Sequence, residues 1–561
     1  MIETPVLIVG GGPSGLMLAN ELGVRGVAAL LVDAKPSTAF NPQANATQAR
    51  TMEHFRRLGF ANEIRQLGLP PDHPTDIAYL TRLSKYELAR LSLPTSAEAA
   101  LSVQNMSGSW SAAELPHRIS QKYVEPVLLK HAEKWKSNEI RFAWKLNRYE
   151  RFADHIKAWI QPIDNSQDEI PVKTLYLIGA DGARSQIRQS LGISFVGATG
   201  VKRGFMGGQM FAVYFKSPTL YSKIPHPRCW MYVTVNAQRR SLLLSVNGSD
   251  EFAFHAAIHE DESADNWTKE DAYFVLSQAL GCEVHAEILS HLTWTAGHSL
   301  YTEKMSDDRI FIMGDAAHLF TPTGGLGYNT AVEDAVNLGW KLASVIKGSG
   351  APGLLETYSM ERALIAKRNT TYAKRFADSV GLFEISEDFE LDTEKGRSDR
   401  KLASDHFNAH VRMEFNIPGV TFGGRYDYSP IIFKEDVDPP VDEPNKYKPF
   451  AGPGGRPPHF WLGDKLSLYD TFGKDWTLLC TGPVVQKHGG FIEAATKYKI
   501  DLKIVHHAQP ELEKLYDAPL ILIRPDQIIA WRGQNDQNAF EVINRVLGWR
   551  VDLASSSFSY L

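Results

Sequence analysis

A glycine-rich turn near the start of the chain constrains the fold more than any other feature. Residues 6–9 form a continuous apolar run, typical of a strand buried on both faces of a parallel sheet. Gly10, Gly12 and Gly15 follow with the spacing Gly-x-Gly-x-x-Gly, and a helix is predicted directly after them. Such glycines let the backbone turn tightly and approach a pyrophosphate, which then lies at the N-terminus of the helix.

An acidic residue completes this pattern. Residues 28–32 form a second apolar strand that ends at Asp33, close to the offset of ~20 residues at which an acid binds a ribose hydroxyl. A glycine pattern alone has low specificity, because glycine turns are common. Here the strand, glycines, helix, second strand and acid occur in the required order, and together they predict a βαβ unit that binds a dinucleotide.

Length and composition limit the remaining possibilities. The 561 residues predict two to four domains at roughly 100–200 residues each. A formal net charge of -5 and the lack of a basic stripe argue against a nucleic-acid partner. Cys229, Cys282 and Cys480 are too sparse for a disulfide scaffold or a zinc site, so no metal is predicted. Neither a signal peptide nor an apolar run of ~18 residues is found, so we expect a cytoplasmic protein without a membrane partner.

Two further turns each follow an apolar strand, and neither is specific alone. Asp181 and Gly182 form a dipeptide that is most often an ordinary β-turn. Gly314 and Asp315 precede a glycine-rich segment at 322–329, after which a helix is predicted. The helix N-terminus offers free N–H donors, which suit an electron-rich ring edge that gains negative charge on reduction.

Taken in order, these motifs resemble the flavoprotein aromatic hydroxylases of the p-hydroxybenzoate hydroxylase fold, and most closely the phenol hydroxylase and 2,4-dichlorophenol 6-monooxygenase branch. The resemblance covers essentially the whole chain and is especially close at residues 329–343. It implies FAD as the bound cofactor and NAD(P)H as a transient co-substrate. The residues that it assigns to the cofactor are Gly10, Gly12, Pro13, Ser14, Gly15, Asp33, Ala34, Gln43, Arg50, Gln121, Asp181, Gly182, Gly314, Asp315, Pro322, Gly325, Leu326, Gly327, Tyr328 and Asn329.

The resemblance also implies a mixed α/β architecture. We expect a Rossmann-like FAD-binding domain with an interleaved β-sheet substrate domain in residues 1–385, the substrate part covering roughly 75–118 and 195–300. Residues 386–440 would connect this region to a thioredoxin-like C-terminal domain at 441–561. A redox role would need a CxxC pair, which is absent, so this domain is interpreted as a structural or dimerisation module of a homodimer.

The implied activity is hydroxylation of a phenolic ring, with O₂ as the oxygen source. NAD(P)H would reduce FAD, and a flavin C4a-hydroperoxide would pass its distal oxygen to the ring, ortho to an existing hydroxyl. In this branch an Asp or a His usually occupies the position of Asn45, and an amide cannot act as a base. Flavin-dependent Baeyer–Villiger insertion, epoxidation or oxidative decarboxylation therefore stays open, as does an inactive FAD-binding scaffold.

Candidates for the substrate site lie on the predicted substrate sheet, on the flavin loop and at Asn45, where the sequence differs from the rest of the branch. The residues expected to bind the substrate are Asn45, Trp230, Met231, Tyr232, Pro322 and Thr323. The candidates for catalysis are Tyr232, Asn45 and His318. Each has an ordinary alternative, since an aromatic residue on a strand is more often part of the core and a buried histidine more often structural.

Overall fold

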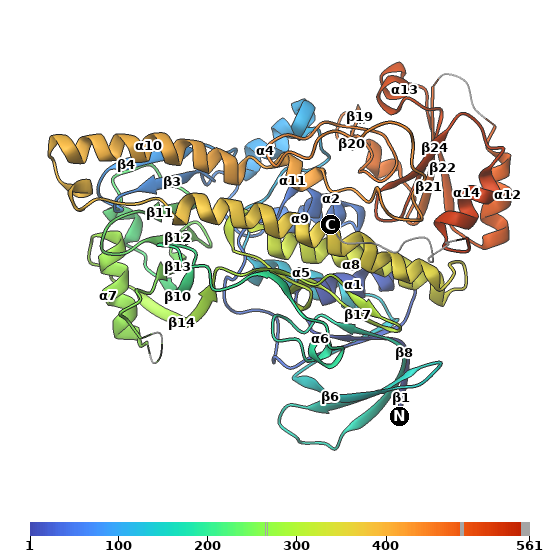
Figure 1. The fold of residues 1–561 in the computed structure, drawn as a ribbon, viewed down its shortest axis with the longest axis horizontal. Coiled ribbons are helices and arrows are strands. Elements are labelled where there is room, and N and C mark those ends of the chain that lie inside the picture. Colours follow the sequence, from blue (N-terminus) through green and yellow to red (C-terminus); the bar gives the residue numbers. More distant parts are fainter. Residues whose placement is uncertain (264, 266, 483–486, 551–561) are drawn as a thin grey trace.

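The computed structural model describes residues 1–263, 265, 267–482 and 487–550, and Figure 1 shows three regions along this part of the chain. An eight-stranded sheet lies near the N-terminus, a seven-stranded sheet lies at the left of the view, and an α/β domain follows at the C-terminal end. The fold is thus a mixed α/β architecture with several sheets, as the resemblance predicts.

The eight-stranded sheet is built on the predicted βαβ unit. β1 (Ile2–Val9) leads into α1 (Pro13–Val24) and then β2 (Ala29–Asp33), and β1 pairs in parallel with both β2 and β8 (Ile170–Gly179). Parallel strands bring their carboxyl ends to one edge, so the turns after β1, β8 and β17 (Ile310–Ile312) meet there. The other strands of this sheet are β5 (Asn138–Phe142), β6 (Trp144–Arg151), β7 (Ile156–Pro162) and β16 (Ser306–Asp307).

The seven-stranded sheet combines two segments far apart in sequence. Its strand order is β14-β10-β13-β12-β11-β3-β4, in which β11 pairs in parallel with β3. One face packs against α7 (Lys269–Leu280), and the other faces the end of α10 (Glu394–Phe415). The strands are β3 (Ile77–Leu80), β4 (Glu87–Leu91), β10 (Gly208–Lys216), β11 (Met231–Thr234), β12 (Ser241–Ser245), β13 (Glu251–Ala257) and β14 (Glu287–Ala296).

Long helices cross the molecule: α8 (Leu326–Ile346) and α9 (Gly353–Gly381) lie between the eight-stranded sheet and the C-terminal domain, and α10 runs along the seven-stranded sheet beside β4 (Figure 1). α8 follows the glycine-rich segment, as predicted, and packs against α1 and α9. α10 lies in the segment at 386–440 that was expected to connect the domains. α5 (Gln121–Glu133) contains Pro126 inside the helix.

The C-terminal domain is a four-stranded mixed sheet with the order β22-β21-β23-β24, covered by helices. β21 pairs in parallel with β22 and antiparallel with β23. Residues 551–561 of the predicted domain lie outside the described part. The elements are β21 (Trp476–Thr481), α12 (Gly489–Tyr498), β22 (Leu502–His507), α13 (Pro510–Tyr516), β23 (Leu520–Ile523), β24 (Ile529–Gly533) and α14 (Ala539–Val546).

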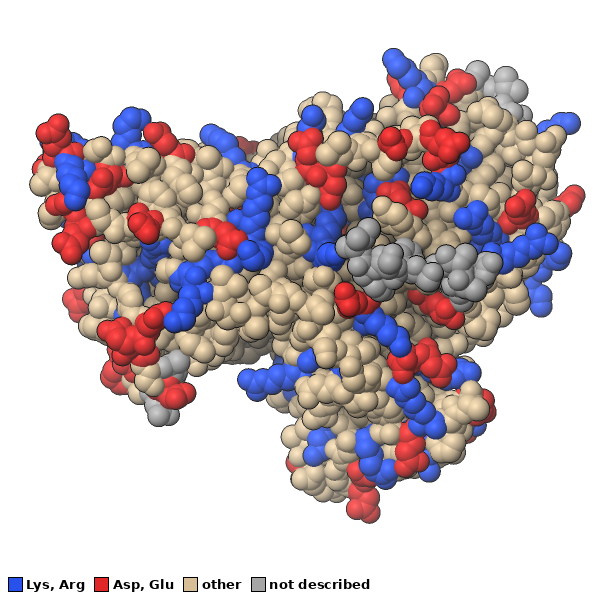
Figure 2. Space-filling view, viewed as in Figure 1, with Lys and Arg blue, Asp and Glu red and all other residues tan. Residues whose placement is uncertain are grey.

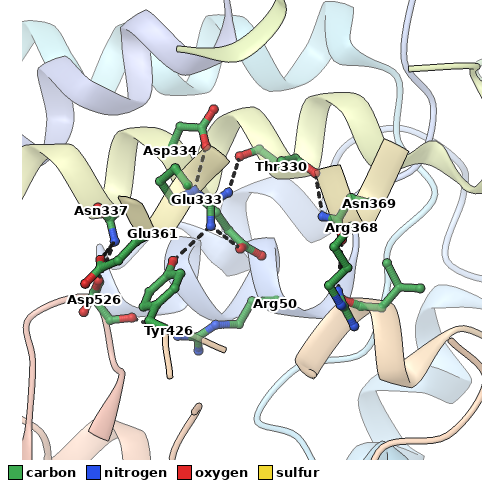
Figure 3. Close-up of polar contacts among 12 residues, drawn as sticks. Arg50, Thr330, Glu333, Asp334, Asn337, Glu361, Arg368, Asn369, Tyr426 and Asp526 are labelled. Atoms are coloured by element: carbon green, nitrogen blue, oxygen red, sulfur yellow. Dashed lines mark hydrogen bonds and ion pairs between the residues drawn. The ribbon is translucent and has the colours of Figure 1, made fainter. Parts of the chain in front are cut away.

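A buried ionic cluster joins the C-terminal domain to α8 and α9, and Figure 3 shows part of it, where Asn337 of α8 contacts Glu361 and Asp526. Glu361 of α9 accepts hydrogen bonds from both terminal nitrogens of Arg524, at 2.7 and 2.8 Å, and from Nζ of Lys341 on α8 at 2.7 Å. Arg524 also donates to Asp526 at 2.6 Å. Because all four side chains are almost completely buried, each charge depends on its partners for stabilisation.

The described surface carries no large patch of one sign on the face shown in Figure 2, where basic and acidic side chains are interspersed. Within the described residues, no helix is long and apolar enough to cross a membrane, and no cluster of potential metal ligands occurs. The three cysteines form no disulfide.

Candidate active site

A single large cavity of about 1830 Å³ extends from the glycine turn after β1 to the inner face of the seven-stranded sheet. Small-molecule sites usually measure roughly 300–1,000 Å³, so this volume suits two ligands side by side. Figure 2 shows a hollow between the region of β14 and that of β6, and both strands contribute outer lining residues.

The glycine turn has the geometry that a pyrophosphate requires. A Cβ atom at Gly10 would lie 2.0 Å from the carbonyl oxygen of Ala180, and one at Gly15 would lie 1.9 Å from that of Gly10. At Gly12 a Cβ would meet open space, so the backbone faces the cavity directly. The N-terminus of α1 has neither a capping side chain nor an acid in its first turn, so its N–H donors are available to an anion.

Two acidic residues, Asp33 and Asp315, line the cavity together with the glycine turn, and the three features are called the cradle below. Oδ2 of Asp33 accepts a hydrogen bond from the N–H of Gly11 at 2.5 Å, which fixes the carboxylate at the end of β2. The side chain of Asp315 is open to the cavity, yet burial within the protein raises the pKa of its carboxyl. α8 begins next to it without a capping side chain or a first-turn acid, so a second helix N-terminus points toward the cavity.

A loop formed by residues 39–48 lines the cavity through residues 41–46. Its Ala44 carbonyl accepts the N–H of Gln121 at 2.6 Å, and its Ala39 N–H donates to Glu125 at 2.6 Å. Asn45 lines the cavity, donates from Nδ2 to Pro42 at 3.1 Å, and leaves Oδ1 without a partner. A buried acceptor without a partner is costly, so this atom is suited to a ligand hydroxyl.

The seven-stranded sheet supplies a largely apolar wall with two free polar atoms. Met231 and Val233 of β11 line the cavity. His255 of β13 and Trp294 of β14 meet edge to face at 5.9 Å, and neither Nδ1 of His255 nor Nε1 of Trp294 has a hydrogen-bond partner among the described residues. Burial lowers the pKa of His255 to about 4, so this imidazole is neutral near pH 7. The wall can therefore hold a flat apolar ligand and bind a polar group on it.

The structure brings most of the predicted site residues to this cavity. The predicted residues that line it are Gly10, Gly12, Pro13, Ser14, Asp33, Ala34, Gln43, Asn45, Gln121, Asp181, Gly182, Trp230, Met231, Asp315, Pro322, Thr323, Gly325, Leu326, Gly327 and Tyr328. Six predicted residues do not line it: Gly15, Arg50, Tyr232, Gly314, His318 and Asn329.

The structure places Tyr232 and His318, two of the catalytic candidates, among buried residues and not in the lining of the cavity. Side chains alternate across a strand, so Tyr232 points away from the face that carries Met231. Its hydroxyl accepts the N–H of Cys229 at 2.8 Å inside the core beneath α7. His318 is fully buried, and its Nε2 lies 2.7 Å from Oδ2 of Asp334.

The remaining four residues support the cavity from behind. Arg50, expected at the cofactor, donates instead to the backbone oxygens of Asp526 and Gln527 at 3.0 and 3.2 Å, and so binds the C-terminal domain. Asn329 holds the loop, because its Nδ2 donates to the carbonyls of Ala46 and Gly325 at 3.0 and 2.7 Å. The last two are glycines at positions of close packing. A Cβ at Gly15 would lie 1.9 Å from the carbonyl oxygen of Gly10, and a Cβ at Gly314 would lie 3.0 Å from Oγ of Ser14.

Several lining residues were not foreseen from the sequence: Tyr79, Gln209, His255, Trp294 and Glu414. The period-2 alternation of β13 and β14 separates their two faces, but it does not say which face lines a cavity. Glu414 carried no local signal at all, since it lies in the last turn of a polar helix.

Comparison with known proteins agrees with this arrangement. The FAD binding domain model matches residues 3–373, and the aromatic-ring hydroxylase C-terminal model matches residues 451–549. The chain is 28% identical to the 2,4-dichlorophenol 6-monooxygenase of Delftia acidovorans over 96% of each protein. It is 28% identical to the phenol 2-monooxygenase of Pseudomonas sp. (strain EST1001) over 95% of this chain and 90% of that protein.

A solved structure, the rebeccamycin biosynthetic enzyme RebC with reduced flavin, superimposes with a TM-score of 0.87 at 29% identity, covering 98% of this chain and 99% of that chain. The FAD model matches well over half of the chain, and the glycine turn, the two uncapped helix N-termini and the cavity fit the cofactor. The chain therefore belongs to the FAD-binding aromatic-ring hydroxylases and is an FAD-dependent monooxygenase.

Proposed function

We propose that the protein hydroxylates a phenolic aromatic substrate, using NAD(P)H and O₂. The observation that carries this proposal is the unpaired Oδ1 of Asn45 at the junction between the FAD cradle and the apolar sheet wall. A phenolic hydroxyl can donate to this oxygen while its ring lies along the apolar wall. Bound in the cradle, FAD supplies the redox chemistry, in which electrons from NAD(P)H reach O₂.

The chain's own contribution is binding, orientation and exclusion of water. We propose that the N–H groups at the start of α1 bind the pyrophosphate, that Asp33 binds the ribose, and that the N-terminus of α8 faces the flavin ring. Met231 and Val233 would hold the substrate ring in a dry part of the cavity. The relatives' names mention phenol, a polyketide and rebeccamycin biosynthesis, which is compatible with a wall that binds ligands of different size.

The test is NAD(P)H consumption by the FAD-loaded protein with a panel of phenols, with H₂O₂ and product mass measured alongside. We expect one class of phenol to accelerate consumption and to gain one oxygen atom, with little H₂O₂ released. Stimulation without ring oxygenation, or formation of an ester, a lactone or CO₂, would refute the phenol hydroxylase assignment. The matched variant is Asn45→Asp, which places a carboxylate where the amide stands and should shift activity toward lower pH.

A further inference from the structure

A buried carboxylate lies beside the turn that precedes α8. Glu414, in the last turn of α10, lines the cavity and accepts the N–H of Gly324 through Oε1 at 2.9 Å. The carbonyl oxygen of the same glycine, Gly324, accepts a hydrogen bond from Nε2 of Gln48 at 3.0 Å. Ala46 lies against the next residue, since a Cβ at Gly325 would be 3.3 Å from the Cβ of Ala46. Glu414 and the loop that carries Asn45 therefore flank the same turn.

The partner of this carboxylate is unusual for a buried acid. Buried carboxylates are normally paired with Arg or Lys, whereas the ion-pair partner of Glu414 among the described residues is His410, with Nε2 2.9 Å from Oε2. His410 is itself buried, and among the described residues neither of its ring nitrogens makes a hydrogen bond, so its approach to Glu414 is a close contact only. A carboxylate that no Arg or Lys neutralises can accept a proton.

Two further titratable groups lie at this pair: His406, whose ring stacks on that of His410 at 6.4 Å, and Tyr79 of β3, which also lines the cavity. Burial, together with the charge of Glu414, raises the pKa of the Tyr79 phenol well above its usual value. Tyr79 therefore stays protonated and cannot serve as the base. Its ring meets His410 edge to face at 5.7 Å and so fixes the imidazole behind the carboxylate.

We propose that Glu414 is the base that takes the proton of the substrate hydroxyl, a role that Asn45 cannot fill; this rests on the proposed function. The O–H bond of the phenol breaks, the proton forms a bond to the Glu414 carboxylate, and the electron pair stays on the phenolic oxygen. No electron is transferred to the protein in this step. Before this step the hydroxyl donates to Oδ1 of Asn45, and the proton turns to the Glu414 carboxylate as the O–H bond breaks.

Glu414→Gln separates this role from a structural one. Glutamine keeps an oxygen that can accept the Gly324 N–H, but it cannot take a proton. We expect Glu414→Gln to retain FAD and to lose roughly a hundredfold in product formation with a weakly acidic phenol at neutral pH. The loss should shrink as pH rises or as more acidic phenols are used, because these ionise without help. Glu394→Gln, an exposed position at the start of the same helix, is the matched control and should behave as wild type.

A second measurement does not depend on turnover. The visible absorbance of bound 4-nitrophenol shows whether it is neutral or ionised, and at a pH below its solution pKa we expect phenolate in wild type and neutral phenol in Glu414→Gln. Neutral phenol in wild type overturns the proposal, and so does equal turnover of both proteins. A loss that is the same for all phenols and accompanied by loss of FAD also overturns it, since Glu414 would then only hold the turn. If wild type neither binds nor oxygenates any phenol, the proposed function itself fails.

Discussion

Replacing Glu361 by Gln tests whether the buried ionic cluster around this residue holds the C-terminal domain in place. The Glu361 carboxylate is almost fully buried and accepts hydrogen bonds from Arg524 and Lys341. In the variant, Arg524 keeps its ion pair with Asp526 at 2.6 Å. Lys341, by contrast, loses the carboxylate that pairs with it among the described residues. Removing one partner of a buried ion pair costs roughly 3–5 kcal/mol, so we expect a loss of about 4 kcal/mol in the free energy of unfolding.

The assay is urea unfolding of the FAD-loaded full chain, followed by tryptophan fluorescence. This signal reports on the interface because Trp340 of α8 and Trp476 of β21 meet edge to face at 5.6 Å across it. Glu356→Gln, an exposed position on the same helix as Glu361, is the control and should change stability by less than about 0.5 kcal/mol. A loss below about 1 kcal/mol for Glu361→Gln would refute the reasoning, because the cluster would then add little to domain docking.

Three further variants test other parts of the structure. Gly15→Ala would place a Cβ 1.9 Å from the carbonyl oxygen of Gly10, so bound FAD per chain should fall at least tenfold, and unchanged FAD content would contradict the packing role. Tyr232→Phe should cost about 1 kcal/mol of stability and leave kcat within twofold, whereas a large fall in kcat would restore its catalytic role. Burial lowers the pKa of Lys341 from 10.5 to about 8, so the unfolded chain binds more protons between these values and stability should rise with pH there by up to about 3 kcal/mol. Lys341→Met should lack that rise, and an equal pH dependence of the urea midpoint in both proteins would contradict it.

Much of the fold follows from local sequence. The apolar run before Gly10, the open backbone at Gly12 and the acid at Asp33 occur within one βαβ unit, and the structure forms that unit with the predicted order. The later motifs at Asp181 and Asp315 reach the same cavity because parallel strands end at one edge of the sheet. The proposed domain limits and the homodimer stay predictions.

The substrate side could not be read from the sequence in the same way. Three consecutive residues, from Trp230 to Tyr232, were assigned to one pocket, although alternation on a strand turns Tyr232 to the opposite face from Met231. Arg50 was assigned to the cofactor, yet its guanidinium binds a domain that lies more than four hundred residues later in the chain.

The sequence by itself determined the parts of this protein that depend on neighbouring residues: the glycine turn, the flanking strands, the helices and the order of the cofactor motifs. Backbone sterics and hydrogen bonding act over a few residues, so those features are visible in a short stretch of chain. Only the tertiary structure decided which side chains share the substrate cavity. Asn45, His255 and Glu414 come from three distant segments and meet through the packing of the loop, the sheet and α10, which no local pattern encodes.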